Sequence, residues 1–331
     1  MVVDNECIRN GSGSDVFGPG DGPTCQPIPN CIRFSFFKRG VMDLQEYFQR
    51  IGFSGPFEKP DLSTLQQVHR QHVMSIPFEN LCFHSQEQFS SELPQIYSKL
   101  VQQRRGGCCY ESNQLLLWVL EQMGYTCSFL GARVYNFCTQ DFSEKAAHLI
   151  VRVEVEGSSY VADTSFGLAD QILEPLELVS GKEQPQPGGT FCLRQDGDMW
   201  TLDRTARQPH IPNEEFSKSS LVIRTLVNKV FCFTLEPRKL DDFRAIGEFV
   251  TTSPKTLYTN KSLCSIVTPT GYRSLVGWVY VEVTFAYQEK FDLMDMRRIT
   301  DDEVQDLLRE KFGLPTIPNL QLKNNRGVFV M

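Results

Sequence analysis

The chain has 331 residues, of which 41% are hydrophobic and 22% charged, and its formal net charge is −7. This composition is typical of a globular protein with more than one structural unit. No block of Lys and Arg could hold a phosphate backbone, which argues against nucleic-acid binding, and no apolar run approaches the roughly 20 residues that span a bilayer.

The first part of the chain divides into a polar extension and a helical segment. Residues 1–41 include a stretch rich in Gly, Pro, Ser and Asn, and we interpret them as a flexible extension that is dispensable for chemistry. Residues 42–124 contain four stretches with helical periodicity or end signals. The first follows Asp43, the second ends before Pro77, the third begins at Pro94 and the fourth starts at Cys109. We predict a helical bundle here.

The middle segment, residues 125–235, changes to strand-like patterns. Leu149, Val151, Val153 and Val155 alternate with their neighbours, as in a half-buried strand. We predict strands over 126–135, 148–156, 160–164, 190–193, 200–203, 221–226 and 230–235. This pattern favours an antiparallel β-barrel.

The last segment, residues 236–331, mixes both types. A helix is predicted around Leu240, a single long strand over 275–287, and a final helix behind the Thr300–Glu303 capping box, ended by Gly313. We expect an α/β lid, so that the whole chain belongs to the α+β class.

One segment has the features of a reactive loop: Arg104-Arg105-Gly106-Gly107-Cys108-Cys109. Two glycines allow a sharp turn, and a cysteine at the start of a helix lies where free N–H groups and the helix dipole favour an anion. Such positions lower a thiol pKa from about 8.5 to roughly 3.5–7.5. A buried, inert cysteine is the alternative, and the dipole does not distinguish Cys109 from Cys108.

A thiolate nucleophile needs a base, and the base needs an orienting group. His148 begins one predicted strand and Asp163 lies in the next, beyond a turn at Glu156-Gly157-Ser158. For any even-length hairpin loop these two side chains share a face of the sheet. A purely structural ion pair would satisfy the same pattern. Glu79 is flanked by apolar residues and needs a cation, for which Arg105 is the best candidate.

The eleven cysteines do not indicate a metal site or a disulfide framework. They include no C-x-x-C pair, and no histidine is flanked by cysteines at zinc-ligand spacing. Free thiols in a reducing cytosol are the simpler interpretation. We therefore expect a cytoplasmic protein without a metal.

These motifs resemble those of the arylamine N-acetyltransferase family. Arg105-Gly106-Gly107-Cys108-Cys109 is similar to its R-G-G-aromatic-C signature, and the resemblance continues through the segments at 77–81, 148, 160–163, 233–237 and 252–254. It covers essentially all of residues 42–331. The segment 174–192 resembles the animal form of the family, to which residues 1–41 would add an N-terminal extension.

The resemblance implies a fold, an activity and a set of site residues. The fold would place a cysteine-protease-like Cys-His-Asp core between the bundle and the barrel. Cys109 would be the acetylated nucleophile, His148 its partner and Asp163 the orienting acid, which selects Cys109 over Cys108. The remaining expected contacts are, for the acceptor, Phe78, Val134, Phe166 and Leu168, and, for coenzyme A, Tyr135, Lys145, Phe249 and Lys255.

The implied reaction is transfer of an acetyl group from acetyl-CoA, as co-substrate, to aromatic amines and hydrazines, and to N-hydroxyarylamines, by a ping-pong mechanism with a thioester intermediate. A role in xenobiotic metabolism and a monomeric state are expected, with no nucleic-acid or membrane partner. Asp170, near the acceptor site, would disfavour anionic acceptors. Two alternatives remain at this point: a cysteine peptidase or transglutaminase with the same triad, and a binding protein without activity.

Overall fold

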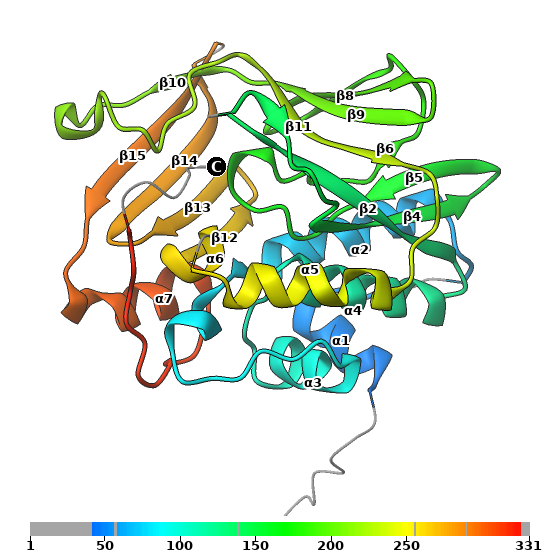
Figure 1. The fold of residues 1–331 in the computed structure, drawn as a ribbon, viewed down its shortest axis with the longest axis horizontal. Helices are drawn as coiled ribbons and strands as arrows, with labels where there is room; N and C mark the ends of the chain where they lie inside the picture. Colours follow the sequence, from blue (N-terminus) through cyan, green and yellow to red (C-terminus); the bar gives the residue numbers. More distant parts are fainter. Residues whose placement is uncertain (1–41, 56–57, 138, 255, 289, 326–331) are drawn as a thin grey trace, which may run out of the picture. The chain divides into compact units, whose positions relative to one another are not determined.

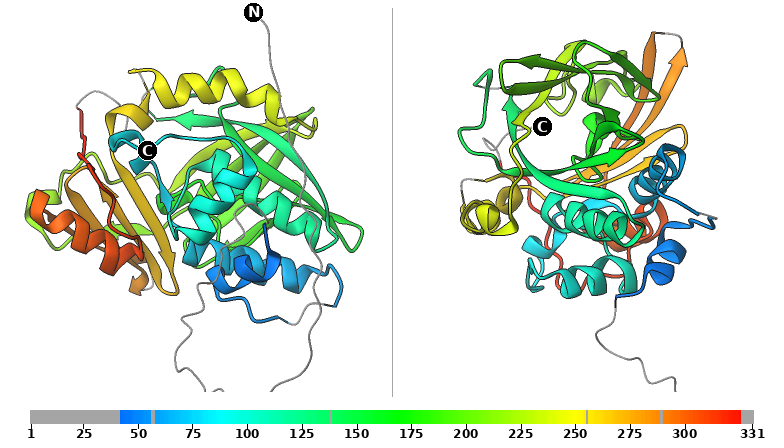
Figure 2. Two further views of the ribbon diagram at one scale, coloured as in Figure 1. Left: turned by 90° about the horizontal axis from the view of Figure 1, so that it is seen from below. Right: turned by 90° about the vertical axis from the view of Figure 1, so that its right-hand side faces the viewer.

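The computed structural model describes residues 42–325, except for 56–57, 138, 255 and 289 (Figure 1). The expected extension 1–41 and the expected coenzyme contact Lys255 lie outside these described residues. In Figure 2 the barrel strands, in green, curl into a nearly closed ring beside the helices of residues 44–122.

The helical segment forms because apolar residues recur on one face of each helix between clear end signals. Asp43 caps the first helix by accepting the backbone N–H of Gln45 at 2.7 Å, and Gly52 ends it with φ of 72°. Four α-helices follow this pattern, the third continued by a π-helical stretch at Ser98–Gln102. Their bounds are α1 Leu44–Ile51, α2 Leu62–Ser75, α3 Leu93–Tyr97 and α4 Cys109–Gln122.

The middle segment is an antiparallel sheet that curls into a nearly closed barrel, with the order β6-β5-β4-β2-β11-β9-β8-β7 and a short β3 beside β2. Leu130, Ile150, Phe191 and Leu202 fill its interior. The strands are β2 Thr126–Asn136, β3 Asp141–Phe142, β4 His148–Val155, β5 Ser158–Ala162, β6 Leu176–Glu177, β7 Glu183–Gln186, β8 Gly189–Asp196, β9 Met199–Thr205 and β11 Val227–Thr234.

Two glutamine side chains bridge the gap between the end strands β6 and β7. The Gln186 amide accepts the backbone N–H of Leu173 at 2.7 Å and donates to the carbonyl of Glu174 at 2.9 Å. Gln184 makes the same pair of bonds with the backbone of Glu177, at 2.8 and 3.0 Å. We call these four bonds the glutamine seam. Side-chain amides thus satisfy backbone groups that a ladder would otherwise pair.

The last segment contributes three α-helices and the strands β12 to β15. These strands form a second sheet with β1 and β10 from the earlier segments, in the order β1-β12-β13-β14-β15-β10. Helix α7 packs on this sheet, with Leu308 and Phe312 against Leu275 and Tyr280. The remaining bounds are α5 Leu240–Thr252, α6 Leu257–Asn260, α7 Val304–Phe312, β1 Phe78–Glu79, β10 Gln208–His210, β12 Leu263–Thr268, β13 Gly271–Val276, β14 Val279–Gln288 and β15 Phe291–Arg298. The predicted α+β class, with bundle, barrel and α/β segment, is confirmed.

One predicted strand is wrong, and another is divided into two by a turn. Residues 221–226 are irregular: Leu221 and Val222 pack in the core, Leu226 is exposed, and the Arg224 side chain satisfies the carbonyls of Ser217 and Val222. The predicted strand 275–287 is the end of β13 and most of β14, joined by a two-residue turn in which Gly277 has φ of 56°. An apolar run does not show where a chain reverses. The division at 124/125 and 235/236 into domains stays a prediction, since residues 40–331 form one compact unit.

Candidate active site

The loop that precedes Cys109 is held by buried charges and close backbone contacts. Arg105 pairs with Glu79, Nη2 to Oε1 at 2.8 Å, as the sequence predicted. A Cβ on Gly106 would lie 2.3 Å from the carbonyl oxygen of Pro77, and one on Gly107 would lie 2.9 Å from Glu111. Neither glycine has a positive φ, so both are required here for space, and not for a left-handed backbone conformation.

Cys109 is the first residue of α4 and is 2% exposed. The carboxylate of Glu111 accepts the backbone N–H of Cys108 at 3.0 Å and is itself paired with Lys99 at 2.7 Å. Because Lys99 compensates this carboxylate, the start of the helix keeps the positive potential of its free N–H groups. The local environment therefore favours an anionic sulfur.

The hairpin β4–β5 brings His148 and Asp163 together, as predicted from their parity. Val155 pairs with Ser158 across a two-residue turn. Continued by one residue, this register places Asp163 opposite Ile150, whose side chain lies on the same face of the sheet as that of His148, two residues earlier. The Nε2 atom of His148 lies 2.6 Å from Oδ2 of Asp163. Both residues are buried: His148 is 4% exposed and Asp163 is 1% exposed. The predicted pair is confirmed as a contact.

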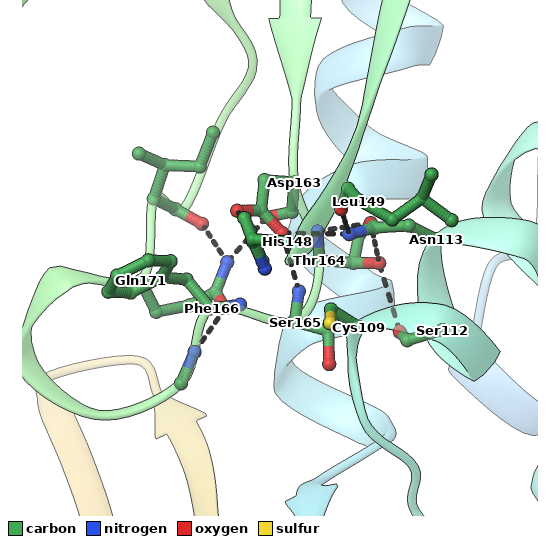
Figure 3. Close-up of polar contacts among 12 residues, drawn as sticks. Cys109, Ser112, Asn113, His148, Leu149, Asp163, Thr164, Ser165, Phe166 and Gln171 are labelled. Atoms are coloured by element: carbon green, nitrogen blue, oxygen red, sulfur yellow. Dashed lines mark hydrogen bonds and ion pairs between the residues drawn. The ribbon is translucent and has the colours of Figure 1, made fainter. Parts of the chain in front are cut away.

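The three ionisable side chains lie beside one another (Figure 3). The neighbouring Cys108 side chain and the His148 imidazolium lower the pKa of Cys109 well below its usual value, although burial opposes this. Burial also disfavours a charged His148, but the charge and hydrogen bond of Asp163 outweigh it and raise the pKa of His148 to about 10. Because Nε2 faces Asp163, Nδ1 is the ring nitrogen left for the sulfur. The site is built to hold a thiolate–imidazolium pair.

Several groups that the sequence analysis missed fix the carboxylate of Asp163. Its Oδ1 accepts Asn113 Nδ2 at 2.9 Å and the backbone N–H of Ser165 at 3.0 Å. His69 accepts the backbone N–H of Asp163 at 3.2 Å, and burial lowers the pKa of His69 to about 4, which keeps it neutral. Asn113 follows Cys109 by four residues on one helix face, so its position near the site could have been inferred.

A hydrogen-bonded chain continues behind Asn113. Thr164 donates to the Asn113 side-chain oxygen at 3.0 Å and contacts Ser112 at 3.0 Å, which in turn lies 2.8 Å from His72. Tyr47 of α1 completes the chain, 2.8 Å from the other nitrogen of His72. All five side chains are buried. Helices α1, α2 and α4 are thereby coupled to the hairpin that carries Asp163.

Aromatic side chains surround the sulfur and the imidazole. The ring of Phe166 meets His148 edge-on at 5.1 Å between centroids, and Phe231 lies 5.7 Å from the same ring. The Tyr258 hydroxyl lies 4.0 Å from the Cys109 sulfur, and its ring meets Phe78 edge-on. Tyr258 had no recognisable sequence signal. Phe78 and Phe166 are therefore placed near the triad, in keeping with their expected acceptor contacts.

A cavity of about 90 Å³ lies between the barrel and the second sheet. Phe166 and Leu168 line it, whereas Val134 is paired with Phe231 within the barrel and is not among the lining residues. Asp170 also lines the cavity, but its carboxylate is paired with Arg204 at 3.0 Å. This pairing weakens the expectation that Asp170 repels anionic acceptors.

A second, larger cleft of about 730 Å³ separates α5 from the loop before His148. Lys145 and Phe249 line it, and Phe249 is 50% exposed, which is unusual for a large apolar side chain. Tyr135 is not among its lining residues and packs instead against Phe142 in the β2–β3 hairpin. Of the four expected coenzyme contacts, the structure thus brings two to one cleft.

Within the described residues, no group of three His, Cys, Asp or Glu side chains could hold a metal ion. The seven cysteines that the structure describes are free thiols. None of the described helices is both long and apolar enough to cross a membrane.

Comparison with known proteins identifies the family. A model of the N-acetyltransferase family matches residues 61–320. The arylamine N-acetyltransferase of Gallus gallus, pineal gland isozyme NAT-10, is 40% identical over 88% of this chain and 100% of its own length, and arylamine N-acetyltransferase 2 of Mus musculus is 38% identical with the same coverage. The chain belongs to the arylamine N-acetyltransferase family.

Solved structures of arylamine N-acetyltransferases share the fold. The M. smegmatis enzyme superposes with a TM-score of 0.70 at 28% identity, over 83% of this chain and 93% of its own. The M. marinum enzyme, solved in complex with CoA, has a TM-score of 0.69 at 24% identity over 82% and 93%. The predicted family and its cysteine-protease-like core are confirmed. The chain is a transferase, and this decides against the peptidase and the inactive binding protein.

Proposed function

We propose that this arylamine N-acetyltransferase carries the acetyl group on Cys109, in a ping-pong reaction that takes acetyl-CoA as the donor and aromatic amines and hydrazines as acceptors. N-Hydroxyarylamines would be further acceptors, with a role in xenobiotic metabolism. The observation that carries the proposal is the buried Cys109–His148–Asp163 arrangement with its lowered thiol pKa. Cytosolic location and a monomeric state stay predictions.

In the first half-reaction the Cys109 thiolate attacks the acetyl carbonyl of acetyl-CoA. A bond forms between sulfur and the carbonyl carbon, and the bond from that carbon to the coenzyme sulfur breaks. The His148 imidazolium donates its proton to the departing coenzyme thiolate. Backbone N–H groups near Cys109 stabilise the tetrahedral oxyanion. The enzyme is left acetylated, with a neutral imidazole.

In the second half-reaction the acceptor amine attacks the thioester. The neutral His148 takes a proton from the attacking nitrogen, and the Cys109 thiolate leaves. This restores the thiolate–imidazolium pair and releases the N-acetyl product. Asp163 stays ionised throughout, orients the ring through Nε2 and stabilises its positive charge.

The cleft beside α5 is suited to the coenzyme. Lys145 and Arg238 supply positive charge for phosphates, and the exposed ring of Phe249 offers an apolar contact. The cleft also reaches Phe243, which packs in the same apolar cluster as Cys109. A chain that enters between α5 and residues 143–147 would therefore arrive at the sulfur.

The test is acetylation of the full chain by acetyl-CoA without an acceptor. We expect one added acetyl group on Cys109, located by fragment-ion mass spectrometry that distinguishes it from Cys108, and its removal when 4-methylaniline is added. Cys109→Ala should lose both the adduct and turnover. Cys127→Ala, which changes a thiol in β2, is the matched control and should keep both. Turnover by Cys109→Ala would exclude the mechanism.

A further inference from the structure

The cavity between the barrel and the second sheet has one polar end. Asn228 lines this cavity and is 2% exposed. Its Nδ2 donates to the backbone carbonyl of Thr225 at 3.0 Å, which fixes the orientation of the amide, while its Oδ1 has no hydrogen-bond partner. A buried acceptor without a partner is uncommon in native structures and calls for a donor.

Each positively charged side chain that lines the cavity has an acceptor within the protein. Arg204 bonds to Asp170 at 3.0 Å and also donates to the carbonyl of Gly188, and Arg207 pairs with Asp292 at 2.6 Å. Lys261, a further lining residue, donates to Asn324 at 2.7 Å. Since each cation already has an acceptor, the unmet requirement at this end is for a hydrogen-bond donor beside Asn228 Oδ1.

The strand β11 connects this polar end to the triad. Asn228 pairs with Arg204 and Phe231 pairs with Leu202, because a bulge between Lys229 and Phe231 inserts one residue. The bulge places Asn228 and Phe231 on the same face of the strand. Phe231 lies against His148, so one strand face runs from the imidazole to the unpartnered oxygen.

Three apolar side chains of the cavity lining also pack against the triad, although Cys109 and His148 are not themselves lining residues. Leu263 and Val276 line the cavity and also belong to the cluster that packs around Cys109. Phe166 contacts His148 and lines the cavity as well. An aromatic ring whose amine is at Cys109 would therefore extend along Phe166 toward Asn228.

We propose that Asn228 is a specificity-determining residue, and that this enzyme prefers arylamines that carry a hydrogen-bond donor, such as a hydroxyl or carboxamide N–H, at the ring position opposite the reacting amine. The proposal rests on the proposed function. In the absence of acceptor the cavity has room for several water molecules. A donor on the substrate replaces water at Asn228 Oδ1, whereas an apolar group leaves that oxygen unpaired.

The test compares kcat/KM for three acceptors. 4-Aminophenol carries the donor, 4-methylaniline matches it in size, and 4-methoxyaniline matches its ring electronics, but neither of the last two can donate from the para position. We expect the full-length enzyme to favour 4-aminophenol over both by about tenfold. A ratio near one against 4-methoxyaniline would overturn the proposal, whether or not any variant folds.

Three variants assign the preference to the residue. Asn228→Leu removes the acceptor. The ratios of kcat/KM for 4-aminophenol to kcat/KM for 4-methylaniline and 4-methoxyaniline should then fall to the ratios of the amines' uncatalysed reaction rates with a thioester. Asn228→Gln retains an amide that can donate to Thr225 and accept from the substrate, and should keep the two ratios above those uncatalysed values. Met294→Leu, a volume-conserving change in the same cavity, should affect all three amines in parallel. Retention of the preference in Asn228→Leu would show that another group binds the donor and would overturn the assignment.

Acetylation of Cys109 by acetyl-CoA alone separates this proposal from the proposed function. It measures the first half-reaction, which needs no acceptor. If the unaltered enzyme does not form the adduct, the proposed function fails. If it forms the adduct and acetylates the three amines at rates that follow their intrinsic reactivity alone, the proposed function stands and the donor site is wrong.

Discussion

The triad and the cleft beside α5 lie near each other but differ in how far their side chains are buried and paired. Around Asp163 the polar groups are buried and each has a defined partner, from Asn113 to Tyr47. In the cleft Phe249 is 50% exposed and Lys145 is exposed as well, although Phe243 and Val250 beside them are buried. Low dielectric and fixed partners strengthen electrostatic interactions in the first region, and water weakens them in the second.

This difference matches the two tasks that we propose. A charged sulfur and a charged imidazole are stable in a buried site only if the surroundings are fixed in advance. A cleft that binds and releases a large co-substrate in each cycle needs only moderate contacts. Substitutions in the two regions should therefore differ in size and in the kinetic parameter that they change.

The largest effect is expected for Asp163→Asn. The amide cannot stabilise the imidazolium and leaves the ring in the wrong tautomer, so kcat/KM should fall by about 10³–10⁴-fold, as for other triads that lose their acid. Asp141→Asn, an exposed change in β3, is the matched control and should have no such effect. A loss of less than tenfold in Asp163→Asn would show that the buried pair is only structural.

The pH dependence of alkylation compares the thiol of the triad, Cys109, with a thiol outside it, Cys127. Cys109 has a lowered pKa, so the rate of its reaction with iodoacetamide should rise much less steeply between pH 6 and 9 than that of an ordinary thiol. Burial raises the pKa of Cys127 to about 12, so its rate should rise about tenfold per pH unit over that range.

Mass-resolved alkylation of the two peptides measures both rates in one sample. At pH 6 Cys109 should react at least roughly a hundredfold faster than Cys127. In Asp163→Asn the Cys109 rate should regain a rise with pH, because the imidazolium that stabilises the thiolate is lost. Parallel pH profiles for the two cysteines in the unaltered enzyme would contradict the buried ion pair.

The smallest effect is expected in the cleft. Lys145→Ala removes one exposed charge, so KM for acetyl-CoA should rise about threefold while kcat stays the same. The rise should shrink as salt is added, since exposed charges are screened. Lys218→Ala, also exposed but not among the cleft residues, provides the comparison. An unchanged KM for Lys145→Ala would place the coenzyme phosphates elsewhere.

Local rules in the sequence predicted the parts of the site that depend on periodicity. Strand parity was sufficient to bring His148 to Asp163, because a shift of two residues keeps both on one face. Buried charge was sufficient to pair Glu79 with Arg105. In both cases the inference needed one hairpin or one loop, and no knowledge of distant segments.

The groups that escaped prediction depend on segments far apart in the chain. Tyr258 reaches Cys109 across 149 positions, and His69 reaches Asp163 across 94. Asn228 lies on the same strand face as Phe231 only because of the bulge in β11, and no residue pattern indicates that bulge. The strand predicted at residues 221–226 was also wrong, because Leu221 and Val222 pack in the core from irregular backbone while Leu226 is exposed.

The glutamine seam bears on how this barrel can vary. A strand ladder fixes every residue in register, so one inserted residue would turn each side chain to the opposite face. Gln184 and Gln186 hold their neighbours at two points only. Insertions and deletions between β6 and β7 can therefore be absorbed without moving His148, and the short end strands leave few backbone groups open to pairing with another molecule.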